Sequence, residues 1–524
     1  MKLNKSTRYF LILFILLLFL KTDYRLEQGI YCCKDDHDYF AHAETLIIDF
    51  DFDYSNQFFE NEQSRFYYKG KSAPSTFIGA GLLSTPFLFF GNLLDENIQN
   101  NDLFNFKIML YSFSSIFYLF LTLLLINKIN LLLNTKYSSY YLYLFLIGSG
   151  VGFYAFERYS MSHIYEVFAI TLLIYNSIKF YKKQNNYLAF IIPLLIMLAL
   201  MTRWVNIYVL FLPLIVAKLT ENKTYFLSKN KYFWISSFLS TNIFLLHTYL
   251  IYGVVTINPE FTYNTSGTIT RYLDSTDGIG AFFWTNLKNL FLMLFGLEFG
   301  LFWFSPIIFM GIYIVLKNFI LSYQKSKFVT LLVVLSFLQV LGLVLIWKST
   351  GSSYGFRYVM NLAPLSIFIL LTNRNLNKFE FMYLKYMSIF ASLSVIYFET
   401  TPKTQLSTEY IINMFGKETK FSSPEYLYGY VNSVIEFESY LKIFSQSFLG
   451  FMIFYFFVYF LGKEPFYDLL SKFSLPYDNP DFQILIEKII EIELLKVIIS
   501  VLFIAYMPYL LLKNTSNTFL RSQK

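Results

Sequence analysis

The residues best suited to chemistry lie in one short stretch near the start of the chain, 34–42. It reads Lys-Asp-Asp-His-Asp-Tyr-Phe-Ala-His and holds three carboxylates and two of the four histidines of the protein. Carboxylates and imidazoles can accept a proton from a reacting hydroxyl group or bind a metal ion. The adjacent pair Asp35 and Asp36 favours proton transfer. His37 and His42 are five residues apart and share a helical face poorly, which disfavours a metal site.

The composition is that of a protein embedded in a membrane. Of the 524 residues, 56% are hydrophobic and only 15% are charged, and the mean hydropathy is +0.47. A soluble protein would carry about 25% charged residues. Apolar runs close to the length of about 20 residues that crosses a bilayer recur along the chain. The sequence therefore predicts an all-α polytopic membrane protein, whose net charge of +7 reflects loop positions and not a nucleic-acid partner.

The basic residues near the N-terminus predict its side of the membrane, because positive residues concentrate in cytoplasmic loops. Lys2, Lys5 and Arg8 surround the start of the first apolar run, 10–20, and predict a cytoplasmic N-terminus. The first run lacks a cleavage site of small residues and is expected to remain as a membrane span.

The rest of the topology depends on how a weaker apolar run, 77–94, is placed. If it lies at the interface, the external loop extends over 21–102, and later lysines such as Lys182 become cytoplasmic. The chain then has about thirteen spans and an external C-terminus. Its last two spans are expected near 443–461 and 497–512.

In this topology the unusual polar residues between the spans fall on the external side. One outward-facing pocket could combine carboxylates with arginines and lysines from several loops. That combination suits the activation of a hydroxyl group beside an anionic, phosphate-bearing ligand. The candidates outside the 34–42 stretch are Asp49, Asp51, Asp53, Lys71, Glu157, Arg158, His163, Arg203, Trp204, Glu298, Tyr354 and Arg357.

Several of these residues also have structural interpretations. Asp49, Asp51 and Asp53 alternate with aromatic residues, so they could form the wet face of an interfacial strand or turn. Their spacing is similar to part of a calcium loop, but the Gly-x5-Glu that completes such a loop is missing. His163 could be a satisfied residue at a helix end, and Arg203 could extend from a helix end toward water.

The motifs together resemble those of a family of membrane enzymes. The pattern D-D-x-x-Y-x-x-H at 35–42, followed by D-x-D-x-D at 49–53, resembles the first external loop of bacterial GT-C glycosyltransferases. The likeness is to the family 39 type, which is related to protein mannosyltransferases and to the lipid A aminoarabinose transferase. Gly-Leu-Phe-Trp-Phe-Ser-Pro at 300–306 and the segment 347–358 fit it as well. The chain departs from the family pattern in carrying Asp36 where glutamate is frequent.

This resemblance implies a fold, a substrate class and a location. The fold would be a GT-C bundle with external juxtamembrane helices over residues 1–461, followed by a cytoplasmic segment and a last transmembrane helix in 462–524. The donor would be a sugar linked to a polyprenyl phosphate, and the acceptor hydroxyl would belong to a glycan, a lipid or a protein. The enzyme would lie in the bacterial plasma membrane with its active site outside. A divalent metal ion is possible in this fold.

The resemblance also implies roles for single residues. Asp35 would be the general base of an inverting displacement, supported by Asp36 and His42, while Glu157 would orient the acceptor or assist Asp35. Cationic side chains would hold the lipid phosphate and stabilise its growing charge; these are Arg203, Arg357 and Lys71. The other expected substrate-binding residues are Tyr39, His163, Trp204, Glu298 and Tyr354.

Two other functions remain open from the sequence. A polymerase or ligase of lipid-linked glycans would use arginines and a large external loop, but the loop at 399–440 is modest in size. A transporter or flippase would place charges along a path through the membrane. Here the charges within spans, Lys107, Glu166 and Lys385, fall near span ends, which favours a single external site.

Overall fold

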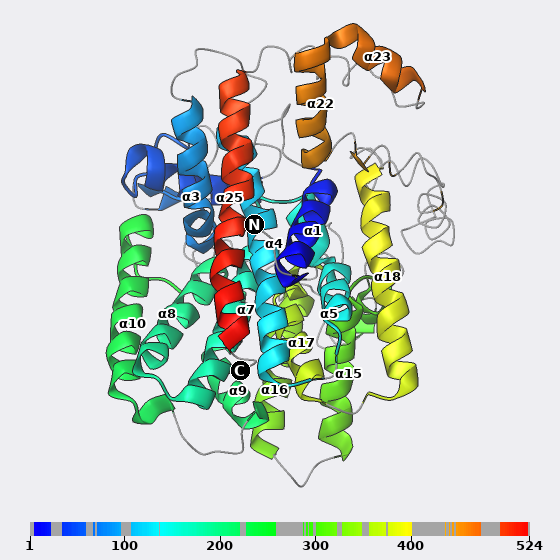
Figure 1. Cartoon of the computed structure of the whole chain (residues 1–524). Helices are drawn as coiled ribbons and strands as arrows, with labels where there is room; N and C mark the ends of the chain where they lie inside the picture. Colours follow the sequence, from blue (N-terminus) through cyan, green and yellow to red (C-terminus); the bar gives the residue numbers. More distant parts are fainter. Residues whose placement is uncertain are drawn as a thin grey trace.

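The computed structural model of the chain is mainly α-helical (Figure 1). It describes residues 5–22, 34–58, 67–68, 71–95, 106–135, 137–220, 227–257, 287, 290–291, 293–296, 300–321, 327–347, 356–373, 376–400, 435, 440, 443–444, 447–472 and 493–521. Within these ranges the β structure is a pair of two-residue antiparallel strands, β1 (Tyr67–Tyr68) and β2 (Lys71–Ser72).

The helices of the first half are α1 (Lys5–Leu20), α2 (Lys34–Glu44), α3 (Gly79–Asp95), α4 (Phe106–Leu132), α5 (Ser139–Leu146), α6 (Gly152–Phe156), α7 (His163–Lys183), α8 (Asn186–Thr202), α9 (Leu212–Thr220) and α10 (Lys231–Tyr252). Those of the second half are α14 (Leu301–Phe304), α15 (Pro306–Leu321), α16 (Lys327–Trp347), α17 (Leu362–Thr372), α18 (Lys378–Thr400), α22 (Phe448–Leu461), α23 (Lys463–Lys472) and α25 (Leu494–Arg521). Short helical turns connect them at η1 (Thr45–Asp49), η2 (Ile147–Val151), η3 (Trp204–Leu210), η4 (Leu227–Lys229) and η5 (Arg357–Val359).

Several helices are apolar enough to cross a membrane. Among the described residues, four helices have both the length and the composition: Phe106–Leu132, Ser139–Phe156, Lys231–Tyr252 and Leu494–Leu512. Six shorter apolar helices, of 10–17 residues, accompany them. The fold is thus helical and rich in apolar helices, as expected, whereas the predicted number of spans stays a prediction.

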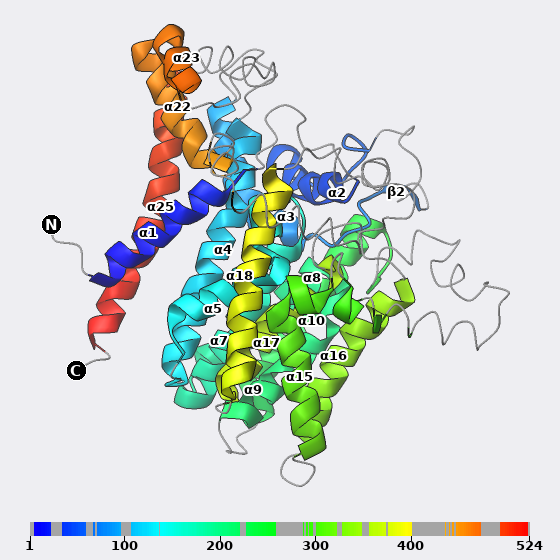
Figure 2. The same ribbon diagram turned by 90° about the vertical axis from the view of Figure 1, so that its right-hand side faces the viewer.

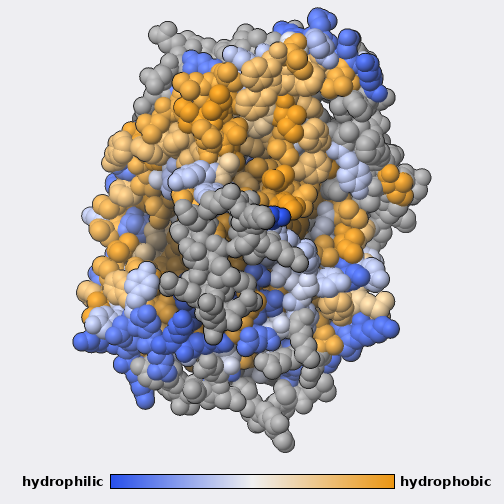
Figure 3. Space-filling view, in the orientation of Figure 1, coloured by the Kyte–Doolittle hydropathy of each residue, from blue (hydrophilic) through white to orange (hydrophobic). Residues whose placement is uncertain are grey.

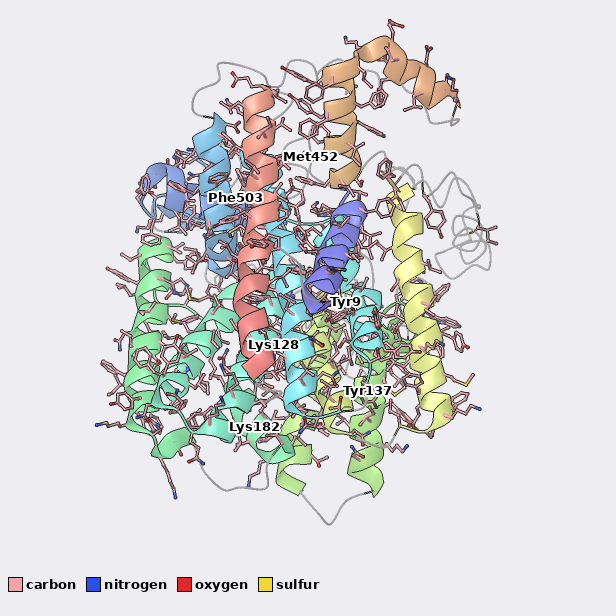
Figure 4. The ribbon with its side chains drawn as sticks, viewed as in Figure 1. Tyr9, Lys128, Tyr137, Lys182, Met452 and Phe503 are labelled. Atoms are coloured by element: carbon pink, nitrogen blue, oxygen red, sulfur yellow. The ribbon has the colours of Figure 1, made fainter. Side chains whose placement is uncertain are left out.

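The apolar surface is distributed as a membrane environment would favour. α4 lies inside the bundle between α3 and α7, while α10 and α25 expose large apolar side chains such as Phe238 and Leu502. Figure 3 shows apolar surface across the upper and middle part of one face and a hydrophilic rim at its lower end. Lys182 lies at this lower end (Figure 4). Large exposed apolar surfaces of this kind mark contact with another apolar phase.

The two ends of the bundle can be told apart from contacts along α4. Lys107 in its first turn pairs with Glu44 at the end of α2, with 2.5 Å between Nζ and Oε1. At the other end of α4, Lys182 donates a hydrogen bond to the carbonyl of Leu132. We call the end of the bundle near Lys107 the α2 end and the end near Leu132 the Lys182 end. A helix of 27 residues separates them by about 40 Å.

α3 fixes α2 at its end of the bundle. It runs antiparallel along the first half of α4, and its last residue, Asp95, accepts a hydrogen bond from the backbone N–H of Lys107 at 2.7 Å. A Cβ on Gly79 would lie 2.5 Å from the backbone of Met201 at the end of α8, and one on Gly81 would lie 2.5 Å from Cβ of His42. Only glycine permits such close approach. The expected interfacial helix at 77–94 therefore forms, but it packs along α4.

The last helices of the chain are α22, α23 and α25. α22 has 14 residues and is about 21 Å long, too short for a hydrocarbon core of about 30 Å. It starts beside α1, where the backbone N–H of Phe448 donates to the carbonyl of Lys21 at 2.7 Å, and leads to α23 at the same end as α2 (Figure 2). α25 then runs down the bundle toward the Lys182 end. The structure therefore places α23 at the opposite end of the bundle from the end of α25. The predicted cytoplasmic segment and last transmembrane helix in 462–524 and the external C-terminus stay predictions.

Candidate active site

Helix α2 is anchored by its own polar side chains. Asp38 accepts hydrogen bonds from the hydroxyl of Ser75 at 2.9 Å and from its backbone N–H at 3.3 Å. His42 is fully buried, and its Nε2 donates to the carbonyl of Thr76 at 2.7 Å. Its Nδ1 therefore accepts from the hydroxyl of Tyr54, also at 2.7 Å. His42, which the sequence suggested for substrate binding, thus uses both ring nitrogens to hold Tyr54 and Thr76, which follow α2 in the chain.

Burial lowers the pKa of His42 to about 3, although its bond to the Thr76 carbonyl acts in the opposite direction. In the unfolded chain the imidazole of His42 binds a proton near pH 6.5, whereas in the folded chain it stays neutral at this pH. The folded state therefore binds fewer protons, and this contribution to stability is lost progressively as the pH falls below about 6.5.

We expect His42→Gln to reduce the loss of stability on acidification. Between pH 6.5 and 5.0, the free energy of unfolding of the wild type should fall by about 2 kcal/mol more than that of the variant. Thermal unfolding of the purified protein at a series of pH values measures this difference. His37→Gln, at a half-buried position of the same helix, is the control for exchanging an imidazole for an amide. Equal pH profiles for His42→Gln and the wild type would contradict the assignment.

The connection between α6 and α7, residues 157–162, docks on the other side of α2. Asp36 is buried and accepts hydrogen bonds from the guanidinium of Arg158 at 2.9 Å and from the hydroxyl of Ser160. The hydroxyl of Tyr39 donates to the hydroxyl oxygen of Ser162 at 2.9 Å. Asp36 and Tyr39 therefore hold this connection against α2, which fixes where α7 begins.

Asp35 has a different environment from Asp36. Its side chain is 32% exposed, and its Oδ2 lies 3.2 Å from Nη2 of Arg357. The same Nη2 donates to the hydroxyl of Tyr358 at 2.9 Å, and the guanidinium lies 4.9 Å from the centre of that ring. Burial alone would lower the pKa of Arg357, but Tyr358 and Asp35 raise it on balance. Asp35 is thus a partly exposed carboxylate beside a permanently charged arginine.

The backbone before Arg357 is strained. Phe356 has φ 55° and ψ 68°, a left-handed conformation that bulky residues adopt rarely. Such strain costs on the order of 1–3 kcal/mol and is concentrated at functional sites. Here it starts the turn η5 and sets the direction of the Arg357 side chain.

A second arginine reaches the same tyrosine from another part of the chain. Arg203 follows α8, and its guanidinium lies 5.3 Å from the centre of the Tyr358 ring. Its Nη1 donates to Oε1 of Glu166 at 3.2 Å. Burial alone would lower the pKa of Arg203, but Glu166 raises it on balance. Two charged guanidiniums therefore meet at Tyr358, one with Glu166 and one with Asp35.

Glu166 is the residue that sequence reasoning missed as part of the site. It is fully buried in the first turn of α7, where it also accepts from Nδ1 of His163 at 3.0 Å and from Nδ2 of Asn206 at 3.3 Å. The sequence showed it as a charge near a span end. The available signal was its spacing of three residues from His163, which puts both side chains on one helical face.

The structure also shows the surroundings of three other predicted residues. Lys71 donates to the carbonyl of Leu250 at 3.1 Å, at the end of α10. Trp204 packs partly buried against the apolar core, and Glu157 is buried at the start of the 157–162 connection. Two further predicted residues, Glu298 and Tyr354, lie outside the described residues.

The acidic repeat at 49–53 forms local turns. Asp51 accepts from the backbone N–H of Asp53 at 3.0 Å, and Asp53 accepts from that of Ser55 at 3.1 Å. Asp49 accepts from the side-chain amide of Gln57 at 2.5 Å. This arrangement supports the interpretation as a wet turn.

The residues present do not fit a metal site. In the part of the chain that the structure describes, no group of three or more His, Cys, Asp or Glu side chains is placed to hold a metal ion. Asp35, Asp36 and Glu166 each face an arginine instead.

Comparison with known proteins gives little direct guidance. No protein-family model matches the chain, and no curated protein matches it either. Among solved structures, the chain is similar to the archaeal oligosaccharyltransferase AglB from Archaeoglobus fulgidus, in complex with an inhibitory peptide and a dolichol-phosphate. The TM-score is 0.37 at 12% sequence identity, and the match covers 93% of this chain and 59% of that one. This chain therefore spans less than two thirds of that protein, and a likeness at this level does not establish a fold or a function.

Proposed function

We propose that this chain is a membrane glycosyltransferase of the GT-C type, which transfers a sugar from a polyprenyl-phosphate donor to an acceptor hydroxyl group. The observation that carries the proposal is the convergence of Asp35, Arg203 and Arg357 at Tyr358. An exposed carboxylate can take a proton, and two adjacent guanidiniums suit the oxygens of a phosphate group. The motifs of the sequence place the same residues in these roles.

In the proposed mechanism, Asp35 accepts the proton of the acceptor hydroxyl while that oxygen attacks the anomeric carbon of the sugar. The bond between the anomeric carbon and the phosphate oxygen breaks, and its electron pair stays on the phosphate. The products are the glycosylated acceptor and a polyprenyl phosphate. A single displacement inverts the anomeric configuration. Arg203 and Arg357 stabilise the negative charge that grows on the leaving phosphate.

Asp35 suits the role of base better than Asp36. Asp36 is buried and holds Arg158 and Ser160 in place, whereas about a third of the Asp35 side chain is open to an acceptor. Glu157 would orient the acceptor, and Trp204, Glu298 and Tyr354 would complete the substrate site. These four assignments rest on the family resemblance.

The proposed location is the bacterial plasma membrane, with the α2 end external and the Lys182 end cytoplasmic. Lysines gather at the Lys182 end, where Lys182 and Lys183 end α7 and Lys231 begins α10. Positive residues favour the cytoplasmic side. With α23 at the α2 end, this orientation puts the end of α25 on the cytoplasmic side, in place of the external C-terminus expected from the sequence.

The proposal is tested by the lipid-linked sugars of a strain that lacks the protein. We expect one polyprenyl-phosphate sugar to accumulate and one envelope glycan to lose that sugar, and the wild-type gene should reverse both. The accumulated lipid should react with a membrane-impermeant oxidant added to cells whose outer membrane is permeabilised and whose plasma membrane is intact. Accumulation on the inner leaflet would indicate a flippase, and accumulation of a diphosphate-linked oligosaccharide would indicate a polymerase or ligase. An unchanged profile would contradict the proposal.

A further inference from the structure

The two arginines at Tyr358 pair with carboxylates that differ in their exposure to water. Arg203 pairs with Glu166, which is fully buried and accepts from two further side chains, so this pair belongs to the permanent structure. Arg357 pairs with Asp35, whose side chain is 32% exposed. The Arg357 side chain itself is only 15% exposed, so the two pairs differ mainly in their carboxylates. A carboxylate that keeps contact with water gives up an ion pair more readily than a fully buried one. The first arginine is therefore fixed, whereas the second can change its partner.

The ion pair between Asp35 and Arg357 joins the proposed base to one of the proposed phosphate-binding groups. A carboxylate oxygen that accepts from a guanidinium is engaged by that contact and is less available to a reacting hydroxyl group. In the structure, Asp35 and the Tyr358 hydroxyl share Nη2 of Arg357. The base proposed for the acceptor is thus held by the cation proposed for the donor.

We infer that Asp35 occupies Arg357 until the donor binds, and that the lipid phosphate displaces it. This inference rests on the proposed function. A phosphate group can bond an arginine through two parallel N–H···O contacts and meets Arg203 beside it, so it competes well with a single carboxylate contact. Release of Asp35 then makes it available to the acceptor hydroxyl. Donor binding therefore switches on the base, and the donor binds before the acceptor is deprotonated.

If Asp35 and the lipid phosphate compete for Arg357, removing the charge of Asp35 should strengthen phosphate binding, even though Asp35 is the proposed catalytic base. While Asp35 holds Arg357, only a fraction of the molecules can bind phosphate fully, and the apparent affinity is reduced by that fraction. Asp35→Asn should therefore bind a polyprenyl phosphate more tightly than the wild type does. We expect a gain of about two- to fivefold, as for the loss of an ion pair worth up to about 1 kcal/mol.

The test measures binding of undecaprenyl phosphate to the purified full-length protein in nanodiscs. Four proteins are compared: the wild type, Asp35→Asn, Arg357→Gln and the double variant. Arg357→Gln should bind more weakly, and Asp35→Asn should bring no gain in the Arg357→Gln background. Asp51→Asn removes the same charge from an exposed position of the same loop and is expected to leave the affinity unchanged.

The outcomes separate this inference from the proposed function. An equal gain from Asp35→Asn with and without Arg357 would indicate simple charge repulsion and would overturn the inference. Binding by the wild type with no gain in Asp35→Asn would also overturn it, while the donor class would stand. If none of the four proteins binds undecaprenyl phosphate, the proposed donor class fails and the inference fails with it.

Discussion

Asp35→Asn is expected to lower the rate of sugar transfer by about 10²- to 10⁴-fold, which is the usual contribution of a positioned general base. The asparagine amide has the shape of the carboxyl group and can still accept a hydrogen bond from Arg357, but it cannot take the proton of the acceptor. The Asp35 side chain is 32% exposed, so the change in folding free energy should stay within about 1 kcal/mol.

This expectation is measured by complementing the strain that lacks the protein. The variant should reach wild-type abundance in the membrane and leave the donor lipid accumulated. Asp51→Asn, in an exposed local turn of the same loop, is the matched control and should restore transfer fully. Wild-type transfer by Asp35→Asn would remove Asp35 from the role of base.

Glu166→Gln is expected to have the largest effect on stability. It leaves Arg203, whose side chain is only 10% exposed, without its buried carboxylate. Removing one partner of a buried ion pair costs about 3–5 kcal/mol, because the other charge stays uncompensated. The hydrogen bonds from His163 and Asn206 would also lose a charged acceptor. Since Arg203 would then be poorly positioned, binding of undecaprenyl phosphate should weaken as well.

A second glutamine variant provides the comparison for Glu166. Glu464 is exposed in the first turn of α23, so Glu464→Gln should cost less than about 1 kcal/mol. Thermal unfolding of both variants in the same detergent gives the difference. Similar midpoints for Glu166→Gln and the wild type would show that Arg203 does not depend on this carboxylate.

The sequence predicted the parts of the site whose signals are local. Asp35, Arg203 and Arg357 each stand out as polar residues at the ends of apolar runs, where charges are costly and tend to have a function. Their placement on one side of a membrane is a prediction that rests on the lysines of the loops. The helical class and the helix at 77–94 followed from apolar runs of sufficient length.

What could not be predicted depends on contacts between distant parts of the chain. Glu166 has its role because Arg203, 37 residues later, turns back onto α7. Asp36 and His42 carry the same types of functional groups as a catalytic site, but partners at 158–160 and at Thr76 commit them to the fold. The length of α22 could not be predicted from the sequence either. The apolar run predicted a span near 443–461, but α22 covers only Phe448–Leu461, which is shorter than the bilayer core.

The most direct measurement adds purified protein in detergent to membranes from the strain that lacks it. These membranes should contain both the accumulated donor and the unmodified acceptor. Mass spectrometry of the lipids should show the polyprenyl-phosphate sugar falling and polyprenyl phosphate rising with the wild type but not with Asp35→Asn. An unchanged amount of donor with folded wild-type protein, or equal consumption by Asp35→Asn, would contradict the account.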